Sequence, residues 1–319
     1  MKAPPVERIY NIFLHFENGN CSKLGYEIHE TGLDDQSAVS YLQERVSVDC
    51  KTAQIYWLKS PFTEAEYYAR ARLAQSHHLI DDFFEHIGAT LTPLFVVTTV
   101  VNGEPTVNYA SEHNKPLNMK DVRRSLGEEG EMIDWLEKYT SADGVDIPQL
   151  IHDDYFLAIK LTFNAGLHVS SMKLLLSCID SVAYIEFGND KPTPFIDWLD
   201  AYADLKSLEI SAAELWELRN GILHMSNISS KKVRTNKVRR ISFRAGGPTD
   251  YPKMGTDGIF YFDFYELISA YADAIGRWIA TYNDDRPKFA KFVERYDETI
   301  SDSRVSFTKL ASKAARQST

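Results

Sequence analysis

Residues 214–240 read ELWELRNGILHMSNISSKKVRTNKVRR, and our interpretation of the second half of the chain starts from this stretch. Ser211 lies just before it as a helix N-cap, and Glu214, three residues later, completes a capping box. At about 100° per residue, one face of the resulting helix carries the apolar side chains of Leu215, Leu218, Ile222 and Met225. The sequence therefore predicts an amphipathic helix that buries this face.

Three polar residues occupy other positions of the same helix. His224 lies roughly opposite the centre of the apolar stripe, Asn220 lies one turn before it, and Arg219 lies at the border of the stripe. We therefore expect His224 to face solvent, a cleft or a partner subunit instead of the core.

The segments around this helix also have helical spacing. Helices are expected at about 153–164, up to Phe187 after an interruption at Gly166, from Thr193-Pro194, over 264–282 and from Pro287. The turn-rich stretch TSADGVDIPQ at 140–149 marks a domain boundary. The sequence thus predicts a helical domain at 149–300, wholly helical apart from its loops, and a flexible tail at 301–319.

The region 1–148 is expected to be mixed α/β, with an unknown role. A helix is predicted from Ser60, as N-cap, to Gly88. Residues 91–110 predict a β-hairpin, because Asn102-Gly103 suits a tight turn and both flanks are rich in β-branched residues. Pro105 would place the second strand at a sheet edge. Residues before Ser60 contain no motif that we interpret, and the fold class predicted for the whole chain is mainly α.

The helical segments and the RNGILH motif together resemble the HEPN superfamily. Its ribonuclease members carry an arginine, a polar residue directly after it and a histidine a few positions on, which here match Arg219, Asn220 and His224. The stretch LLLSCIDSVAYIEFG at 174–188 is similar to the long helix that precedes the motif helix. The resemblance covers about residues 150–300 and implies a HEPN-like helical bundle.

The resemblance implies a metal-independent endoribonuclease, usually a homodimer whose two motif helices line one cleft. The chemistry is consistent with these residue types. Histidine can move a proton near neutral pH, and arginine presents a planar set of donors to phosphate oxygens. Asn220 can orient the histidine or bind substrate. The alternative is structural: Arg219 pairs with a carboxylate, Asn220 contacts solvent, and His224 lies at a helix C-terminus, where a cation is favourable.

A dense run of positive charge follows the motif helix. The run contains no acidic residue and consists of Lys231, Lys232, Arg234, Lys237, Arg239, Arg240 and Arg244. Such runs are usually solvated loops, but cations beside a cleavage centre would also hold an RNA backbone, for example that of tRNA. Both interpretations remain open from the sequence.

Composition narrows the class of protein. A formal charge of −10 at pH 7 argues against a nucleic-acid binder with a positive field over its whole surface. No apolar run approaches the roughly 20 residues that cross a bilayer, and no signal peptide is evident, so we expect no membrane association and a cytoplasmic location. The three cysteines are widely spaced, and no nucleotide-cofactor motif occurs, so no cofactor is expected.

A second possible site, for a metal ion, lies in HHLIDDFFEH, residues 77–86. His78, Asp82 and His86 are spaced by four, which on one helix would place two imidazoles and a carboxylate on one face, as a metal site requires. That face lies opposite Ile80, Phe84 and Ile87, so a solvated polar face is the favoured interpretation.

The sequence therefore favours a HEPN-type endoribonuclease that acts as a toxin or antiviral defence effector. Residues 1–148 would sense a trigger, bind a regulatory partner or restrain the nuclease. The alternative is a non-catalytic HEPN-like module for dimerisation and for nucleotide or protein binding. A third hypothesis is a metal-dependent enzyme that uses the N-terminal histidines.

Overall fold

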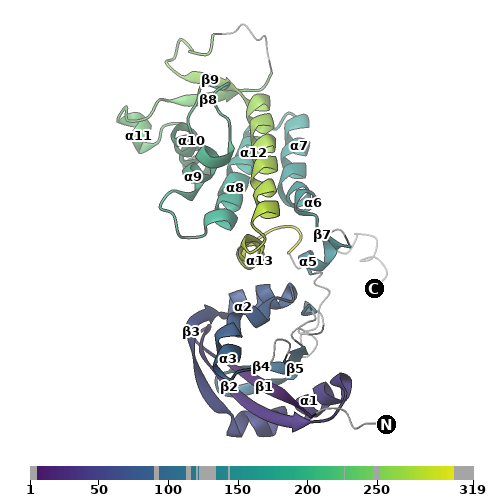
Figure 1. Cartoon of the computed structure of the whole chain (residues 1–319). Coiled ribbons are helices and arrows are strands. Elements are labelled where there is room, and N and C mark those ends of the chain that lie inside the picture. Colours follow the sequence, from purple (N-terminus) through teal and green to yellow (C-terminus); the bar gives the residue numbers. More distant parts are fainter. Residues whose placement is uncertain are drawn as a thin grey trace, which may run out of the picture. The chain divides into compact units, whose positions relative to one another are not determined.

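The computed structural model describes residues 6–89, 93–112, 116–119, 121, 134–142, 144–225, 227–246 and 252–304 (Figure 1). The chain divides into two compact units, Met1–Met132 and Ile133–Thr319. The first contains a mixed sheet, and the second is largely helical. The expectation of a helix-rich chain with a mixed α/β N-terminal part is confirmed at this level.

The first unit is built around five strands. Its described elements are β1 (Glu7–Glu17), β2 (Asn20–Thr31), α1 (Asp35–Thr52), β3 (Gln54–Thr63), α2 (Glu64–Arg72), η1 (Ser76–Ile80), α3 (Asp81–His86), β4 (Leu94–Val101) and β5 (Glu104–Glu112). The strand order is β3-β2-β1-β4-β5, with β1 and β4 parallel and the other neighbours antiparallel.

The predicted hairpin is confirmed. Strands β4 and β5 pair on either side of Asn102 and Gly103, whose φ angles of 53° and 85° are left-handed as a tight hairpin turn requires. Strand β5 with Pro105 lies at the sheet edge, as expected. A second hairpin, β1–β2, turns at Asn18 and Gly19 with φ of 51° and 76°, and sequence reasoning missed it.

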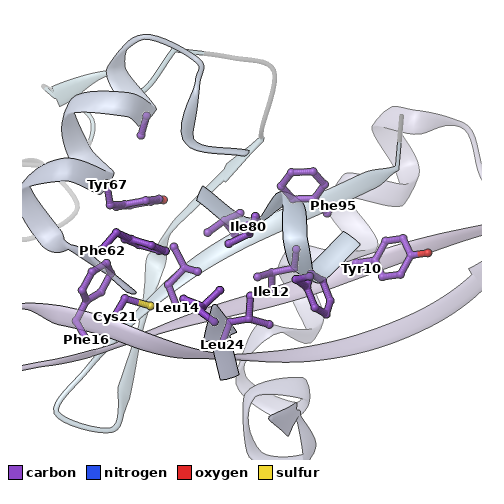
Figure 2. Packing of buried hydrophobic residues seen from close by; sticks show 14 residues of the cluster. Tyr10, Ile12, Leu14, Phe16, Cys21, Leu24, Phe62, Tyr67, Ile80 and Phe95 are labelled. Atoms are coloured by element: carbon purple, nitrogen blue, oxygen red, sulfur yellow. The ribbon is translucent and has the colours of Figure 1, made fainter. Parts of the chain in front are cut away.

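Both faces of the central strand β1 are buried. Residues on one face pack with the segment from β3 to α3 in a cluster that includes Tyr10, Ile12, Leu14, Phe16, Leu24, Phe62, Tyr67, Ile80 and Phe95 (Figure 2). On the other face, Ile9 and Phe13 pack in clusters with Leu42 and Val46 of α1. Helical segments therefore cover both sides of this strand.

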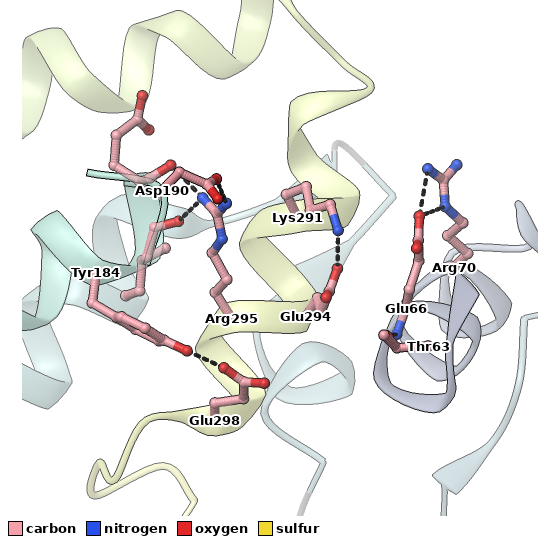
Figure 3. Close-up of polar contacts among 11 residues, drawn as sticks. Thr63, Glu66, Arg70, Tyr184, Asp190, Lys291, Glu294, Arg295 and Glu298 are labelled. Carbon is pink, nitrogen blue, oxygen red and sulfur yellow. Dashed lines mark hydrogen bonds and ion pairs between the residues drawn. The ribbon is translucent and has the colours of Figure 1, made fainter. Parts of the chain in front are cut away.

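The single helix predicted from Ser60 to Gly88 is wrong at its start, and it is also interrupted after Arg72, where Ala74 has a left-handed φ of 56° and the short turn η1 separates α2 from α3. Ser60 and Pro61 belong to β3, which continues to Thr63. Thr63 is the N-cap of α2, because its side chain accepts a hydrogen bond from the Glu66 amide at 3.0 Å. Figure 3 shows this cap beside the Glu66–Arg70 ion pair of the same helix. Edge pairing with β2 holds the Ser60 region in a strand despite its helix-start residues.

The second unit contains most of the predicted helices. Its described elements are α5 (Trp135–Lys138), β6 (Thr140–Ser141), β7 (Gly144–Val145), α6 (Ile147–Ile151), η2 (His152–Phe156), α7 (Leu157–Asn164), α8 (His168–Phe187), α9 (Pro194–Tyr202), α10 (Ala212–Met225), α11 (Lys231–Arg234), β8 (Ile241–Arg244), β9 (Phe260–Asp263), α12 (Phe264–Asp284) and α13 (Lys288–Glu298). The helix predicted from Asp153 instead begins at Ile147 and passes through a π-helical turn, η2.

Helix α8 is central to this unit. It contacts α7, α9, α10 and α13, while α12 contacts α9 and α6 (Figure 1). Trp198 and Trp278 are fully buried at the centre, with their ring centroids 6.2 Å apart. Arg295 of α13 donates to the Ile185 carbonyl at 3.2 Å and pairs with Asp190, which ties the C-terminal helix to the end of α8 (Figure 3).

The second unit begins before the boundary placed at 148/149. Trp135 is 2% exposed, its indole donates to Asp297 of α13 at 2.7 Å, and its ring lies 4.5 Å from that of Tyr296. Trp135 therefore packs with a helix that follows the predicted boundary. The sequence offered a turn-rich stretch as boundary, but those turns connect elements within one unit.

Two further expectations need correction. Residues after 149 are not wholly helical, because β8 and β9 form a parallel pair within the basic region and just before α12. The tail predicted at 301–319 is packed at its start: Ser301 is buried, and the Ser303 amide donates to Asp154 at 2.9 Å. Residues 305–319 lie outside the described residues.

Candidate functional site

Helix α10 begins as its sequence predicts. The Glu214 amide donates to the Ser211 hydroxyl at 3.3 Å, and the Ser211 amide donates to the Glu214 carboxylate at 2.7 Å. This reciprocal pair is a capping box. Leu215, Leu218 and Ile222 are buried, whereas His224 is exposed. The helix thus presents its histidine away from the core, as expected.

The structure brings the three predicted catalytic residues together. Arg219 Nη1 lies 3.0 Å from Asn220 Oδ1 and 2.9 Å from His224 Nε2. Arg219 Nε donates to Asp180 Oδ2 of α8 at 2.8 Å, and the guanidinium lies 5.0 Å from the centre of the Trp216 ring. We call Asp180, Arg219, Asn220 and His224 the arginine cluster.

The contact between Arg219 and His224 fixes the state of the imidazole. A guanidinium has only donors and stays protonated in proteins, so Nε2 of His224 must accept the hydrogen bond. The imidazole in this arrangement is therefore neutral, with its proton on Nδ1. A neutral imidazole with an accepting Nε2 is the form that can remove a proton from a hydroxyl.

Asp180 is a site residue that sequence reasoning missed. Its side chain is 28% exposed, and burial raises its pKa, while the hydrogen bond and the charge of Arg219 act in the opposite direction. The sequence contains one signal for it, a single carboxylate within the otherwise apolar or small run LLLSCIDSVAYI. Which cation meets that carboxylate depends on how α8 and α10 pack.

This ion pair was one expectation of the structural alternative, in which Arg219 simply pairs with a carboxylate. That alternative does not require the other two contacts of the guanidinium. Nη1 is directed to Asn220 and His224, and the side chain of Arg219 is 19% exposed. The arrangement therefore suits both a structural ion pair and a preorganised phosphate-binding group.

Gly221 determines where the chain runs after α10. A Cβ atom at this position would lie 2.3 Å from the carbonyl oxygen of Asn227, and the Asn227 amide donates to the Gly221 carbonyl at 3.0 Å. Only glycine permits so close a backbone approach. The chain after the motif thus turns back and packs on α10.

The basic residues lie along α10, where two of them meet acids. Lys232 pairs with Glu217 at 3.0 Å, and Arg239 pairs with Glu214 at 2.7 Å. Glu214 lies ten residues before His224, roughly 15 Å along the helix at 1.5 Å per residue. The run therefore extends from the region of His224 toward the start of α10, and part of its charge is neutralised.

The other cations of the run differ in their surroundings. Arg240 donates to the Ser229 hydroxyl at 3.1 Å, and Arg244 lies 4.7 Å from the centre of the Tyr261 ring. Within the described part of the chain, Lys231, Arg234 and Lys237 form no ion pair and are exposed. These three are the cations most accessible to an external anion.

The N-terminal histidines do not share one helix. His78 lies in η1 and contacts Asp81 at 3.1 Å, whereas His86 ends α3 and packs on the Tyr56 ring at 4.9 Å. Asp82 accepts from the Lys59 amide at 3.0 Å. Among the described residues, no group of three or more His, Cys, Asp or Glu side chains is placed to hold a metal ion.

No helix in the described ranges combines the length and apolar character that a membrane crossing requires. Comparison with known proteins gives no match to this chain, whether with family models, with curated proteins or with solved structures.

Proposed function

We propose that this chain is a metal-independent endoribonuclease of the HEPN type, with the arginine cluster as its catalytic site. The observation that carries the proposal is the position of Arg219 Nη1, 2.9 Å from His224 Nε2 and 3.0 Å from Asn220 Oδ1. A permanent cation, a neutral imidazole and an amide thus converge at the surface of one helix. This set of groups matches the needs of RNA cleavage by its own 2′-hydroxyl.

In the proposed reaction, His224 Nε2 removes the proton of the 2′-hydroxyl, and the 2′-oxygen attacks the adjacent phosphorus. The bond from phosphorus to the 5′-oxygen breaks, and that oxygen receives a proton from a general acid. The products are a 2′,3′-cyclic phosphate and a 5′-hydroxyl end. Arg219 leaves His224 for the phosphate oxygens, where its charge offsets the developing negative charge, and Asp180 keeps the guanidinium oriented.

The general acid is assigned to a second copy of the chain. In a homodimer or larger homo-oligomer with paired motif helices, the partner subunit's His224 in its protonated form supplies the proton. Asn220 then orients the imidazole or binds the ribose. The RNA target, such as a tRNA, would be cleaved in a toxin or antiviral defence response, with the first unit as the regulatory part.

A second candidate function has one observation in its favour. Asp180 and Arg219 form an ion pair that a purely structural helix contact would also show. On this alternative, the second unit is a non-catalytic module for dimerisation and for nucleotide or protein binding.

The experiment that tests the proposal is cleavage of total RNA in a chelator by wild type, His224→Ala and His78→Ala. His78 is a matched control, because it is an exposed histidine of the first unit. We expect His224→Ala to lose about 100-fold to 10,000-fold in rate, the usual contribution of a general base, while His78→Ala retains activity. Fragment ends should carry 2′,3′-cyclic phosphates.

Other outcomes separate the alternatives. Equal cleavage by wild type and His224→Ala would remove the arginine cluster as the site. Activity that requires a divalent metal and His78 would favour the metal-dependent hypothesis. Growth arrest on expression that is abolished by His224→Ala would support a toxin, and an inert wild type that self-associates would support the non-catalytic module.

A further inference from the structure

The segment that follows α10 lines an open polar pocket of about 540 Å³, which we call the arginine pocket. The polar side chains at its wall are Ser229, Arg234, Asn236, Arg239, Arg240 and Asp257. Its volume lies within the range of small-molecule sites, roughly 300–1,000 Å³. Three guanidinium groups around one hollow indicate an anionic ligand.

The three arginines differ in whether their guanidinium groups are already paired with a carboxylate. Arg239 is fixed by Glu214 at 2.7 Å, and its guanidinium lies 3.9 Å from the centre of the Phe260 ring. Arg240 is oriented by the Ser229 hydroxyl but pairs with no carboxylate within ion-pair distance in the described ranges. Arg234 is exposed and, in the same ranges, forms no ion pair. Two cations thus remain to bind a phosphate.

The rest of the wall suits more than a bare phosphate. Val233 and Val238 add an apolar surface. Asp257 accepts from the Tyr261 hydroxyl at 2.8 Å and from the Ile259 amide at 3.0 Å, so it is held as a carboxylate at the wall. A carboxylate repels a simple anion but accepts N–H groups from a base. Cations, an apolar surface and an acceptor together match a nucleotide.

The pocket lies on the side of α10 that carries His224. Glu217 and His224 are seven residues apart, two turns of one face, and Glu217 accepts from Ser230, next to the pocket residue Ser229. Arg239 lies at the Glu214 end of the helix, roughly 15 Å from His224. An RNA strand that leaves the arginine cluster along this face would therefore reach the pocket within a few nucleotides.

We propose that the arginine pocket binds one phosphorylated nucleotide of a single-stranded RNA, a few nucleotides from the bond cleaved at His224. Arg234 and Arg240 hold the phosphate, and the base lies against the valines within reach of Asp257. The identity of the ligand as part of an RNA strand rests on the proposed function.

The test measures binding of a short, labelled single-stranded oligoribonucleotide by fluorescence anisotropy. All proteins carry His224→Ala to prevent cleavage. Arg234→Gln should weaken binding about 10-fold to 100-fold, as expected for a hydrogen bond to a charged group. The slope of log K against log salt should fall by about 0.7 for each phosphate that the variant no longer neutralises. Arg234→Lys should recover part of the affinity.

The control is Arg286→Gln, which removes the same charge from an exposed residue between α12 and α13. If Arg234→Gln binds no more weakly than this control, the proposal is wrong. Titration with a nucleoside 5′-monophosphate and with inorganic phosphate distinguishes an RNA strand from a free nucleotide or free phosphate as the ligand. Tight mononucleotide binding with oligonucleotide binding unaffected by Arg234→Gln would assign the pocket to a free nucleotide, and equal competition by phosphate would exclude recognition of the nucleoside. Both results overturn the assignment to an RNA strand.

The two proposals fail separately. If wild type cleaves RNA but Arg234→Gln binds the oligonucleotide as its control does, the proposed role of the arginine pocket is wrong and the proposed catalytic site is retained. If oligonucleotide binding depends on Arg234 but no RNA is cleaved, the arginine pocket is retained as a binding site and the proposed nuclease activity is wrong.

Discussion

At the scale of single residues, the arginine cluster is defined by three groups that contact one guanidinium. Asp180 takes Nε of Arg219, and His224 and Asn220 share Nη1. Since arginine donates in every contact, its three neighbours must accept. The tautomer of His224 therefore depends on whether Arg219 Nη1 is held at Nε2.

The first prediction concerns this imidazole. In the neutral form of the wild-type His224 imidazole, the proton should lie on Nδ1, because Nε2 accepts from Arg219. Arg219→Gln removes the guanidinium and should change the tautomer balance. Long-range ¹H–¹⁵N NMR of the histidine ring measures it, and a protonated Nε2 in wild type would contradict the contact.

The second prediction concerns Asp180, whose pKa burial raises above its usual value of 3.8. A carboxyl with a raised pKa in the folded state binds its proton more tightly there than in the unfolded chain. The stabilisation that Asp180 contributes by binding this proton is therefore complete below about pH 3.8. It is lost as pH rises through the pKa that Asp180 has in the folded state. As pH rises from about 3.8 through the pKa of Asp180 in the folded state, the unfolding free energy of wild type minus that of Asp180→Asn should therefore fall.

Denaturant unfolding between pH 3.5 and 7 measures this difference. Asp273→Asn is the matched control, because Asp273 is an exposed carboxylate on α12. The plot of its unfolding free energy against pH should run parallel to that of wild type. A difference for Asp180→Asn that increases with pH would show that the Arg219 charge outweighs burial.

At the scale of elements, the third prediction contrasts two helical glycines. In Gly221→Ala the added methyl would lie 2.3 Å from the Asn227 carbonyl, so the returning chain must move. We expect a loss of about 1–3 kcal/mol despite the better helix propensity of alanine. Gly276→Ala on α12 meets nothing within 4 Å and should gain about 1 kcal/mol. Chemical denaturation of both variants checks the pair, and equal effects would contradict the close approach.

The elements that the sequence predicted well are those with local signals. The capping box of α10, the Asn102-Gly103 turn and the apolar period of α12 each depend on residues close together in the chain. Strands β1 and β2 were missed although Asn18-Gly19 carries the same turn signal as Asn102-Gly103. Both faces of β1 are buried, so it lacks the alternation of a half-exposed strand.

The parts of the site that could not be predicted depend on distant packing. Asp180 reaches Arg219 from 39 positions away in the chain, because α8 lies beside α10. The basic run contains no acid of its own, so its pairing with Glu214 and Glu217 appears only when the chain folds back at Gly221. Local patterns identify the charged groups, whereas the return of the chain determines which of them stay free.

At the scale of the whole molecule, the distribution of charge agrees with a local anion site. The chain carries a formal charge of −10, yet seven cations follow α10 in the sequence, and Lys232 and Arg239 are paired with acids of that helix. A polyanion would therefore be attracted over a short range only, within a Debye length of about 8 Å at physiological salt.

The fourth prediction tests where the second unit begins. A fragment that starts at Ile133 should unfold in one cooperative transition, because it retains Trp135 against Asp297 and Tyr296. A fragment that starts at Gln149 lacks this buried tryptophan and should lose at least about 3 kcal/mol, as for truncation of a large core side chain. Thermal and denaturant unfolding compare them. Equal stability would restore the boundary at 148/149.

The π-helical turn η2 has a mechanical consequence. Its adjacent carboxylates hold opposite ends of the second unit: Asp153 accepts from Tyr139 at 2.9 Å, and Asp154 accepts from the Ser303 amide at 2.9 Å. A pulling force applied between residues 134 and 304 would be carried by these two attachments, through two neighbouring residues, and in parallel by the contact between Trp135 and Asp297. Helices α8, α10 and α12 would stay unstretched until these attachments broke.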